Sequence, residues 1–244
     1  MSRLFRIAID GPAASGKSTT AKLLAKKLGF SYIDSGAMFR AVTLKCQLEN
    51  VNPNDISAHN KIVEIAKRCK IRFPSLGKVE LDGQDVSELI RTSDITRNIS
   101  LIASNPDVRE VLANQQRAMA KGELPGAVSN GFEREGKGII KGVVMDGRDI
   151  GTVILPNAEL KVFIVADVHI RAKRRFDELK KRQGAALTDT LDQVEKDLEA
   201  RDLADRTRKI APLLQAKDAV MMDTSYLTIE EQVNAIENMV YERI

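Results

Sequence analysis

Eight consecutive residues near the start of the chain have the pattern of a phosphate-binding loop. Residues 11–18 are Gly-Pro-Ala-Ala-Ser-Gly-Lys-Ser, which matches G-x-x-x-x-G-K-[ST]. In such a loop the backbone N–H groups point at phosphate oxygens, and the start of the following helix adds partial positive charge. Lys17 can then bridge the β- and γ-phosphates of a nucleotide, and the Ser18 hydroxyl can ligate Mg²⁺. The alternative is an ordinary glycine-containing turn between a strand and a helix.

The elements expected on either side give this segment the context that its chemistry requires. Residues 7–10 predict an apolar strand that ends in an aspartate, and residues 17–28 predict a helix that Gly29 stops. Residues 30–34 predict a second strand. A strand, a helix and a strand at this spacing indicate an α/β protein with a parallel sheet.

Two short motifs, each with an arginine, follow predicted strands. Residues 34–40 (Asp-Ser-Gly-Ala-Met-Phe-Arg) follow the second strand, and residues 146–149 (Asp-Gly-Arg-Asp) follow another apolar run. Ligands of parallel α/β sheets bind at the carboxyl ends of the strands. Because a guanidinium group suits bidentate contact with phosphate, we interpret Arg40 and Arg148 as functional. The alternative for each is a solvated charged surface.

The carboxylate at the end of the strand over residues 142–146 is a candidate metal ligand. An apolar run that ends in an acid resembles a Walker B strand, so we assign Asp146 to Mg²⁺, directly or through water. The alternative is a strand-end carboxylate that caps the next turn.

A small insert and a glycine-rich segment interrupt the α/β pattern. Residues 61–91 contain two alternating runs joined by a turn, and they predict a small antiparallel β insert. Residues 121–142 contain six glycines and mixed charges, which predict a long, mobile loop. The other predicted elements are helix over 92–117 with a break at Asn105, strands at 160–165 and 219–222, helices at 169–183 and 191–199, and a capping box at 228–231 that opens the last helix.

Composition excludes several other classes of protein. The chain has 244 residues, 43% apolar and 30% charged, as in an ordinary globular protein of one or two domains. A net charge of +4 is mild, and 4% aromatic residues without tryptophan do not suit nucleic-acid stacking. Two cysteines without C-x-x-C spacing indicate reduced thiols rather than a zinc site. Without a signal-like start or an 18-residue apolar run, we expect a cytoplasmic protein that binds neither membranes nor nucleic acid.

Together the motifs resemble those of the bacterial-type cytidylate kinases. The matching segments cover nearly the whole chain, and they are residues 9–19, 34–37, 83–92, 146–153 and 201–213. The insert and the Gly-Arg-Asp motif distinguish this pattern from adenylate and guanylate kinases. The resemblance implies a P-loop nucleoside monophosphate kinase fold in one domain over residues 1–244, with a five-stranded parallel sheet flanked by helices, a small antiparallel β insert and a helical lid. It also implies the reaction ATP + (d)CMP ⇌ ADP + (d)CDP with Mg²⁺, carried out by a monomer.

For the phosphoryl donor, the resemblance implies that the loop binds ATP, with Mg²⁺ held by Ser18 and Asp146. The implied ATP-binding residues are Gly11, Pro12, Ala13, Ala14, Ser15, Gly16, Lys17, Ser18 and Thr19. The charged side chains implied in catalysis are Lys17, Arg148, Arg201 and Arg208.

For the acceptor, the resemblance implies separate contacts to the phosphate, the ribose and the base of CMP. The phosphate contacts would be Arg40, Arg148 and Arg201, and Asp205 would contact the ribose. Ser35 would lie in the acceptor pocket, and the cytosine contacts would be Ser100, Arg109 and Asp149.

Phosphoryl transfer needs positioning, charge neutralisation and the exclusion of water. We therefore expect residues 169–208 to form a lid that closes over both nucleotides, from which Arg171, Arg174 and Arg175 contact ATP. Two alternatives remain open: another P-loop kinase of a small molecule or nucleoside monophosphate, and a non-catalytic nucleotide-dependent binding module. A panel of acceptors incubated with ATP separates these functions.

Overall fold

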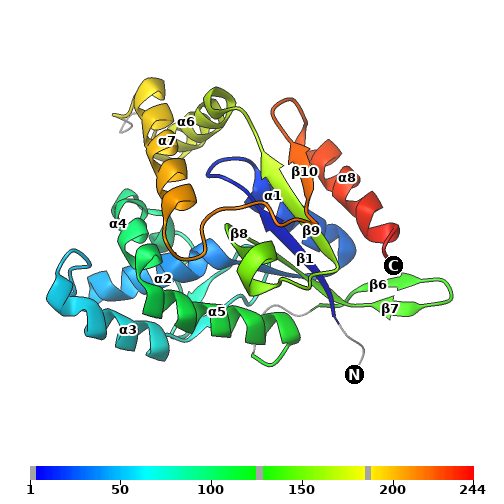
Figure 1. The fold of residues 1–244 in the computed structure, drawn as a ribbon, viewed down its shortest axis with the longest axis horizontal. Helices are drawn as coiled ribbons and strands as arrows, with labels where there is room; N and C mark the ends of the chain where they lie inside the picture. Colours follow the sequence, from blue (N-terminus) through cyan, green and yellow to red (C-terminus); the bar gives the residue numbers. More distant parts are fainter. Residues whose placement is uncertain (1–3, 125–128, 185–187) are drawn as a thin grey trace. The chain divides into compact units, whose positions relative to one another are not determined.

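Parallel strands build the main sheet in the computed structural model of the protein. β1 (Phe5–Asp10) pairs with β9 (Leu160–Val165), and β9 pairs with β10 (Val220–Asp223). β2 (Ser31–Asp34) pairs with β8 (Gly142–Gly147). The strand order is β10–β9–β1–β8–β2 (Figure 1). This five-stranded sheet, whose strands bury long aliphatic runs as parallel strands do, confirms the predicted fold class.

The structure describes residues 4–124, 129–184 and 188–244, and the chain forms two compact units. The first unit is Met1–Arg6 with Ala25–Asp146, and the second is Ile7–Leu24 with Gly147–Ile244. We expected one domain from the sequence. The boundaries fall inside β1, inside the helix over Lys17–Leu28 and inside β8, so no linker composition marks them. Residues 125–128 of the predicted loop and 185–187 of the predicted lid lie outside the described residues.

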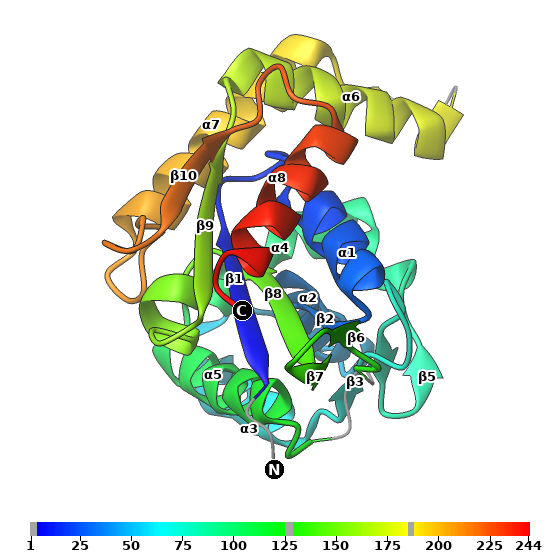
Figure 2. The same ribbon diagram turned by 90° about the vertical axis from the view of Figure 1, so that its right-hand side faces the viewer.

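The second unit contains two adjacent helices in the segment predicted as a lid. α6 (Val168–Gln183) and α7 (Leu191–Thr207) lie side by side, and we call them the helix pair (Figure 1). α7 continues through most of the charged stretch after residue 200. In the same unit, α8 (Ile229–Tyr241) packs along β9 (Figure 2). The predicted capping box at its start is confirmed, because Thr228 and Glu231 bond each other's backbone N–H groups.

Helices dominate the first unit. They are α2 (Ser35–Leu48), α3 (His59–Arg68), α4 (Ser93–Ser104) and α5 (Pro106–Lys121), with short 3₁₀ turns η1 (Ile56–Ala58) and η2 (Leu89–Arg91). The predicted break at Asn105 is confirmed: its side chain accepts the N–H of Asp107 at 3.0 Å, and Pro106 opens α5. Among the described residues, none of the helices is long and apolar enough to cross a membrane.

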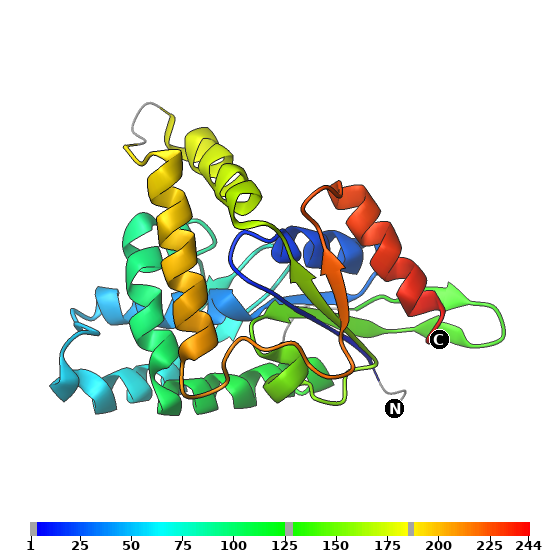
Figure 3. The ribbon, with the colours of Figure 1, turned by 45° about the horizontal axis from the view of Figure 1, so that its top comes forward.

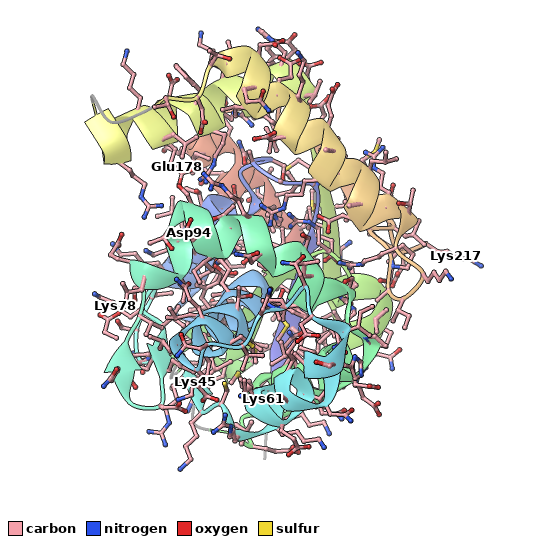
Figure 4. All side chains as sticks on the ribbon, turned by 90° about the vertical axis from the view of Figure 1, so that its left-hand side faces the viewer. Lys45, Lys61, Lys78, Asp94, Glu178 and Lys217 are labelled. Carbon is pink, nitrogen blue, oxygen red and sulfur yellow. The ribbon has the colours of Figure 1, made fainter. Side chains whose placement is uncertain are left out.

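The insert contains a small antiparallel sheet. Its strands are β3 (Ile71–Arg72), β4 (Glu80–Leu81) and β5 (Gln84–Asp85), in that order. An exposed ion pair lies beside it, since Lys78 Nζ is 2.8 Å from Asp85 Oδ2 (Figure 4). The sheet begins later than the predicted insert at 61–91, because residues up to Arg68 complete α3, whose apolar side chains are buried at helical spacing.

A hairpin occupies part of the segment that we expected to be a mobile loop. β6 (Phe132–Arg134) and β7 (Gly138–Ile140) pair antiparallel, and the chain then enters β8 (Figure 3). The Phe132 ring stacks on that of Phe30, with 5.9 Å between ring centroids. The glycines of the segment thus serve the turns of a packed hairpin, and the aromatic partner that holds it lies about a hundred residues earlier in the chain.

Backbone contacts fix the base of this hairpin to the end of α1 (Lys17–Leu28). The N–H of Gly131 donates to the carbonyl oxygen of Gly29 at 2.9 Å. A Cβ on Gly29 would lie 2.6 Å from the Gly131 carbonyl oxygen, and Gly29 has a φ of +62°. Glycine at this position therefore both ends α1, as predicted, and permits the close approach.

Candidate functional site

The phosphate-binding loop of the second unit has the predicted strand–loop–helix context. It leaves β1 at Asp10, and α1 begins at Lys17. A Cβ on Gly11 would lie only 2.2 Å from the carbonyl oxygen of Ile164 in β9, so this position accepts no side chain. Gly16 has a φ of +91°, which glycine adopts without strain. The backbone conformation of the loop therefore depends on its two glycines.

The lysine of the loop lies back over the loop itself. Lys17 is 7% exposed, and its Nζ donates to the carbonyl oxygen of Pro12 at 3.2 Å. Ser18 is half-buried, and Thr19 is exposed. The hydroxyl of Thr224 donates to the carbonyl oxygen of Ser15 at 3.0 Å, which ties the loop to the chain after β10. An ammonium group and a helix N-terminus are thus held together at one turn, an arrangement suited to phosphate.

A buried carboxylate joins the start of the loop to the turn after β8. Asp10 accepts the N–H of Ile150 at 2.9 Å and that of Gly151 at 2.7 Å, one on each oxygen. Burial raises its pKa to about 7, and the two N–H groups and Arg148 oppose that rise. Sequence reasoning assigned no role to Asp10. The only signal was an acid at the end of an apolar strand.

That turn carries part of a cluster of opposite charges. Arg148 Nε donates to Asp205 Oδ2 at 2.6 Å, and Arg208 lies 3.5 Å from Asp205 and 3.7 Å from Asp149. Burial raises the pKa of Asp205, but Arg148, Arg201 and Arg208 together lower it below its usual value. The structure therefore brings together the predicted residues from 146–149 and 201–208 that belong to the second unit.

The three arginines of α6, which we expect to contact ATP, each have a partner within the second unit. Arg171 is buried, and it donates to Asp202 and to backbone carbonyl groups. Arg174 donates to the carbonyl oxygen of Thr224 at 2.6 Å. Arg175 pairs with a glutamate one turn along the same helix at 2.8 Å. Each guanidinium group is engaged within the second unit, and Arg171 is held deep inside it.

In the first unit, one carboxylate at the end of β2 gathers two arginines. Asp34 caps α2 by accepting the N–H of Ala37 at 2.8 Å, and its other oxygen lies 2.8 Å from Arg40 Nη2. Arg91 approaches the same oxygen at 3.7 Å. Sequence reasoning found Arg40 but not Arg91, which lies in η2 and has no motif around it. Only the tertiary structure shows that Arg91 lies near Asp34.

The end of β8 in the first unit is a second polar cluster. Asp146 is 2% exposed, and its Oδ1 accepts the hydroxyl of Tyr32 at 2.8 Å. Ser35 donates to the carbonyl oxygen of Asp146 at 2.7 Å. Burial raises the pKa of Tyr32, and the neighbouring Asp146 raises it further. The tyrosine therefore stays a neutral donor that orients the carboxylate.

The predicted base contacts of the first unit lie on α4 and α5. Arg109 is 7% exposed, its Nη1 donates to the carbonyl oxygen of Ala103 at 3.0 Å, and its guanidinium group lies 5.3 Å from the centroid of the Phe39 ring. Ser100 is exposed on α4. Arg109 is therefore fixed in one orientation, whereas the Ser100 hydroxyl faces solvent.

Comparison with known proteins gives a consistent result over the full chain. A family model described as Cytidylate kinase matches residues 7–242. The chain is 44% identical to a cytidylate kinase of Ligilactobacillus salivarius over 243 residues, which cover 100% of this chain and 99% of that relative.

Two further relatives come from other bacteria. A cytidylate kinase of Chlorobaculum tepidum is 44% identical over 234 residues, with 96% of this chain and 92% of the relative covered. One of Chloroherpeton thalassium is 46% identical over 231 residues, with 94% and 90% covered.

Proposed function

The chain belongs to the cytidylate kinase family, and we propose that its phosphate-binding loop holds ATP while a set of arginines holds CMP or dCMP. The protein is a phosphotransferase that converts CMP and dCMP to their diphosphates with ATP as the donor. The observation that carries the donor assignment is the loop at Gly11, where no side chain fits and a lysine lies across the turn. These features suit the close approach of a backbone to a triphosphate.

ATP is proposed to bind on residues 11–19. The first turn of α1 begins at Lys17, so the positive end of the helix lies at the loop. Lys17 is proposed to reach the γ-phosphate, and this is supported by its buried stem and by its ammonium group, which lies over the loop. The loop was recognisable from sequence because all its parts are consecutive.

Mg²⁺ is proposed to be held by Ser18 and Asp146 together with phosphate oxygens. Hydroxyl and carboxylate oxygens are the ligands that this hard cation prefers, and it commonly keeps several waters. When bound, Mg²⁺ neutralises charge on the β- and γ-phosphates.

The phosphate of CMP is proposed to bind Arg40, Arg148 and Arg201. Each guanidinium group has five N–H donors, so a carboxylate neighbour leaves donors for a phosphate. Asp34 orients Arg40, and Asp205 orients Arg148. The carboxylates thus hold the arginines in defined positions before the dianion arrives.

The nucleoside of CMP is proposed to have separate contacts for its ribose, its pocket and its base. Asp205 would contact the ribose, and Ser35 would line the acceptor pocket. Arg109, fixed by the Phe39 ring and the Ala103 carbonyl group, can present its remaining donors to a base in one orientation. The proposed cytosine contacts are Ser100, Arg109 and Asp149.

The reaction is proposed to be an in-line displacement. An oxygen of the CMP phosphate attacks the γ-phosphorus of ATP, the bond from that phosphorus to the β,γ-bridging oxygen breaks, and ADP leaves. Lys17 and Arg208 would stabilise the charge that is spread over the transferring group. The helix pair is proposed to close over the nucleotides and exclude water, which would otherwise hydrolyse ATP.

A coupled assay of ADP formation tests this function. The purified chain is incubated with Mg²⁺, ATP and one of CMP, dCMP, UMP or AMP, and each rate is compared with that of ATP alone. We expect CMP and dCMP to be the preferred acceptors. A preference for AMP or UMP would indicate another nucleoside monophosphate kinase, and no acceptor-dependent ADP would indicate a binding module. We also propose that the active species is a monomer, which light scattering on the same sample would test.

A further inference from the structure

One buried ion pair joins the two helices of the helix pair. Arg171 on α6 and Asp202 on α7 have side chains that are 7% and 9% exposed, and Arg171 Nη1 lies 2.5 Å from Asp202 Oδ2. Removing two charges from water is costly, so such a pair persists only when its remaining donors and acceptors are also satisfied. The partners that satisfy this pair indicate what it does.

The additional partners are the backbone groups of one residue in the phosphate-binding loop. The N–H of Ala13 donates to Asp202 Oδ1 at 3.2 Å, and the carbonyl oxygen of Ala13 accepts Arg171 Nη1 at 3.1 Å. Arg171 Nε also donates to the carbonyl oxygen of Ala166, just before α6. Both polar backbone groups of Ala13 are therefore held by opposite ends of a single ion pair.

Apolar packing reinforces the same connection. The Ala13 methyl group lies in a small core with Ala172 of α6 and with Val194 and Leu198 of α7, all of them buried. Ala172 directly follows Arg171 in α6, so this core adjoins the contacts that Arg171 makes. The loop residue is thus held by charge on its backbone and by packing on its side chain.

We infer that Arg171 and Asp202 are positioning residues that fix the ATP loop to the helix pair and keep its shape before ATP binds. The inference rests on the proposed role of residues 11–19 in ATP binding. A loop that is already ordered loses less conformational entropy when the triphosphate arrives, so affinity for ATP is higher.

The substitution Asp202→Asn separates positioning from simple electrostatics, because the two make opposite predictions. It leaves the charge of Arg171 uncompensated beside the loop, and added positive charge alone would strengthen ATP binding. Positioning predicts weaker binding instead. We expect the KM for ATP to rise about tenfold, the effect of one hydrogen bond to a charged group, and the KM for CMP to change less than twofold.

Two further variants and one control complete the experiment. Arg171→Lys keeps the charge but loses the forked geometry, so it should also raise the KM for ATP. Asp202→Glu keeps the carboxylate and should restore part of the affinity. Asp218→Asn is the matched control: it removes the carboxylate of a different ion pair, which lies 2.8 Å from the buried Lys161, and neither partner of that pair belongs to the loop, α6 or α7. It should leave both KM values unchanged.

Calorimetric titration with ATP alone measures the affinity of each variant for ATP, and thermal unfolding measures its Tm. Together they separate a loss of positioning from a general loss of stability. Weaker ATP binding by Asp202→Asn, with a KM for CMP near that of the unchanged chain, supports the inference. An unchanged or lower KM for ATP overturns it, as does an equal rise in both KM values that follows a fall in Tm. If the unchanged chain forms no ADP with CMP, the proposed function fails instead, and the titration still tests the loop.

Discussion

The phosphate-binding loop and the acceptor residues proposed in the first unit would bind anions in different ways. The loop uses nine consecutive residues, backbone groups and one lysine, and its shape depends on glycine at position 11. The acceptor residues are side chains from α2, α4 and α5, separated by tens of residues. A local backbone site needs a short motif, whereas a side-chain site needs a folded unit to assemble it.

The two regions also differ in how firmly their charges are held. Ala13 in the loop is fixed by the buried pair of Arg171 and Asp202. In the first unit, Asp34 is shared by Arg40 and by Arg91, whose side chain is 39% exposed. The difference predicts rigid binding of ATP and more adjustable binding of the acceptor phosphate. Four measurements test this prediction.

The largest effect concerns stability at the start of the loop. Burial raises the pKa of Asp10 from 3.8 to about 7, so this group stabilises the folded state fully below pH 4 and loses that contribution as the pH rises through 7. A pKa rise of this size corresponds to a loss of stability on the order of 4 kcal/mol. Asp10→Asn removes this titration. Between pH 4 and 7 the free energy of unfolding in urea should therefore fall more for the unchanged chain than for the variant. Parallel profiles for the two proteins would contradict the buried-charge interpretation.

The next effect is on phosphoryl transfer itself. Lys17→Ala removes the ammonium group that lies over the loop, and we expect it to lose ~2–4 kcal/mol of transition-state stabilisation. In the coupled assay kcat should therefore fall by about thirty- to a thousandfold. Lys22→Ala, at an exposed position of the same helix, is the control. Near-normal turnover of the Lys17 variant would remove the catalytic role of the loop.

A smaller and more selective effect is expected from the cluster after β8. Arg148→Ala removes the arginine that lies 2.6 Å from Asp205, so the KM for CMP should rise about tenfold and kcat should fall. The KM for ATP should change little. Arg97→Ala, which removes an exposed arginine of α4, should leave all three constants unchanged. An effect on ATP alone would place Arg148 with the donor.

The smallest effect tests how adjustable the acceptor region is. Arg91→Ala removes the more distant and more exposed partner of Asp34, so the KM for CMP should rise only about two- to threefold. Arg40→Ala removes the closer partner and should raise it more. If the two variants behaved alike in steady-state kinetics, the phosphate would depend equally on both arginines, and the assigned order of importance would be wrong.

Local signals were sufficient for most of the fold. The loop, the bounds of α1, the break at Asn105 and the capping box at Thr228 each depend on residues within a few positions of one another. The hairpin within residues 121–142 was missed because its glycines have the composition of a loop. Its stacking partner, Phe30, lies in a distant part of the sequence.

Supporting residues were harder to find than residues with a motif. Asp10 looked like a strand end, but it holds the N–H groups of Ile150 and Gly151. Asp202 lies in a charged stretch whose side chains could pair along one helix, but its partner Arg171 is on another helix. Such contacts join residues that are distant in sequence. A single sequence does not show which distant residues come close together in the folded chain.

The sequence by itself indicated the family, through motifs spread over nearly the whole chain. It determined the phosphate-binding loop directly, because a P-loop is a local backbone structure that its glycines and lysine specify. Only the tertiary structure decided that Asp205 holds Arg148 and that Asp202 holds Arg171, partners that lie 57 and 31 positions apart in the chain. Those pairs form when helices and strand ends far apart in the chain pack together, and burial then makes each charge depend on the partner that it meets.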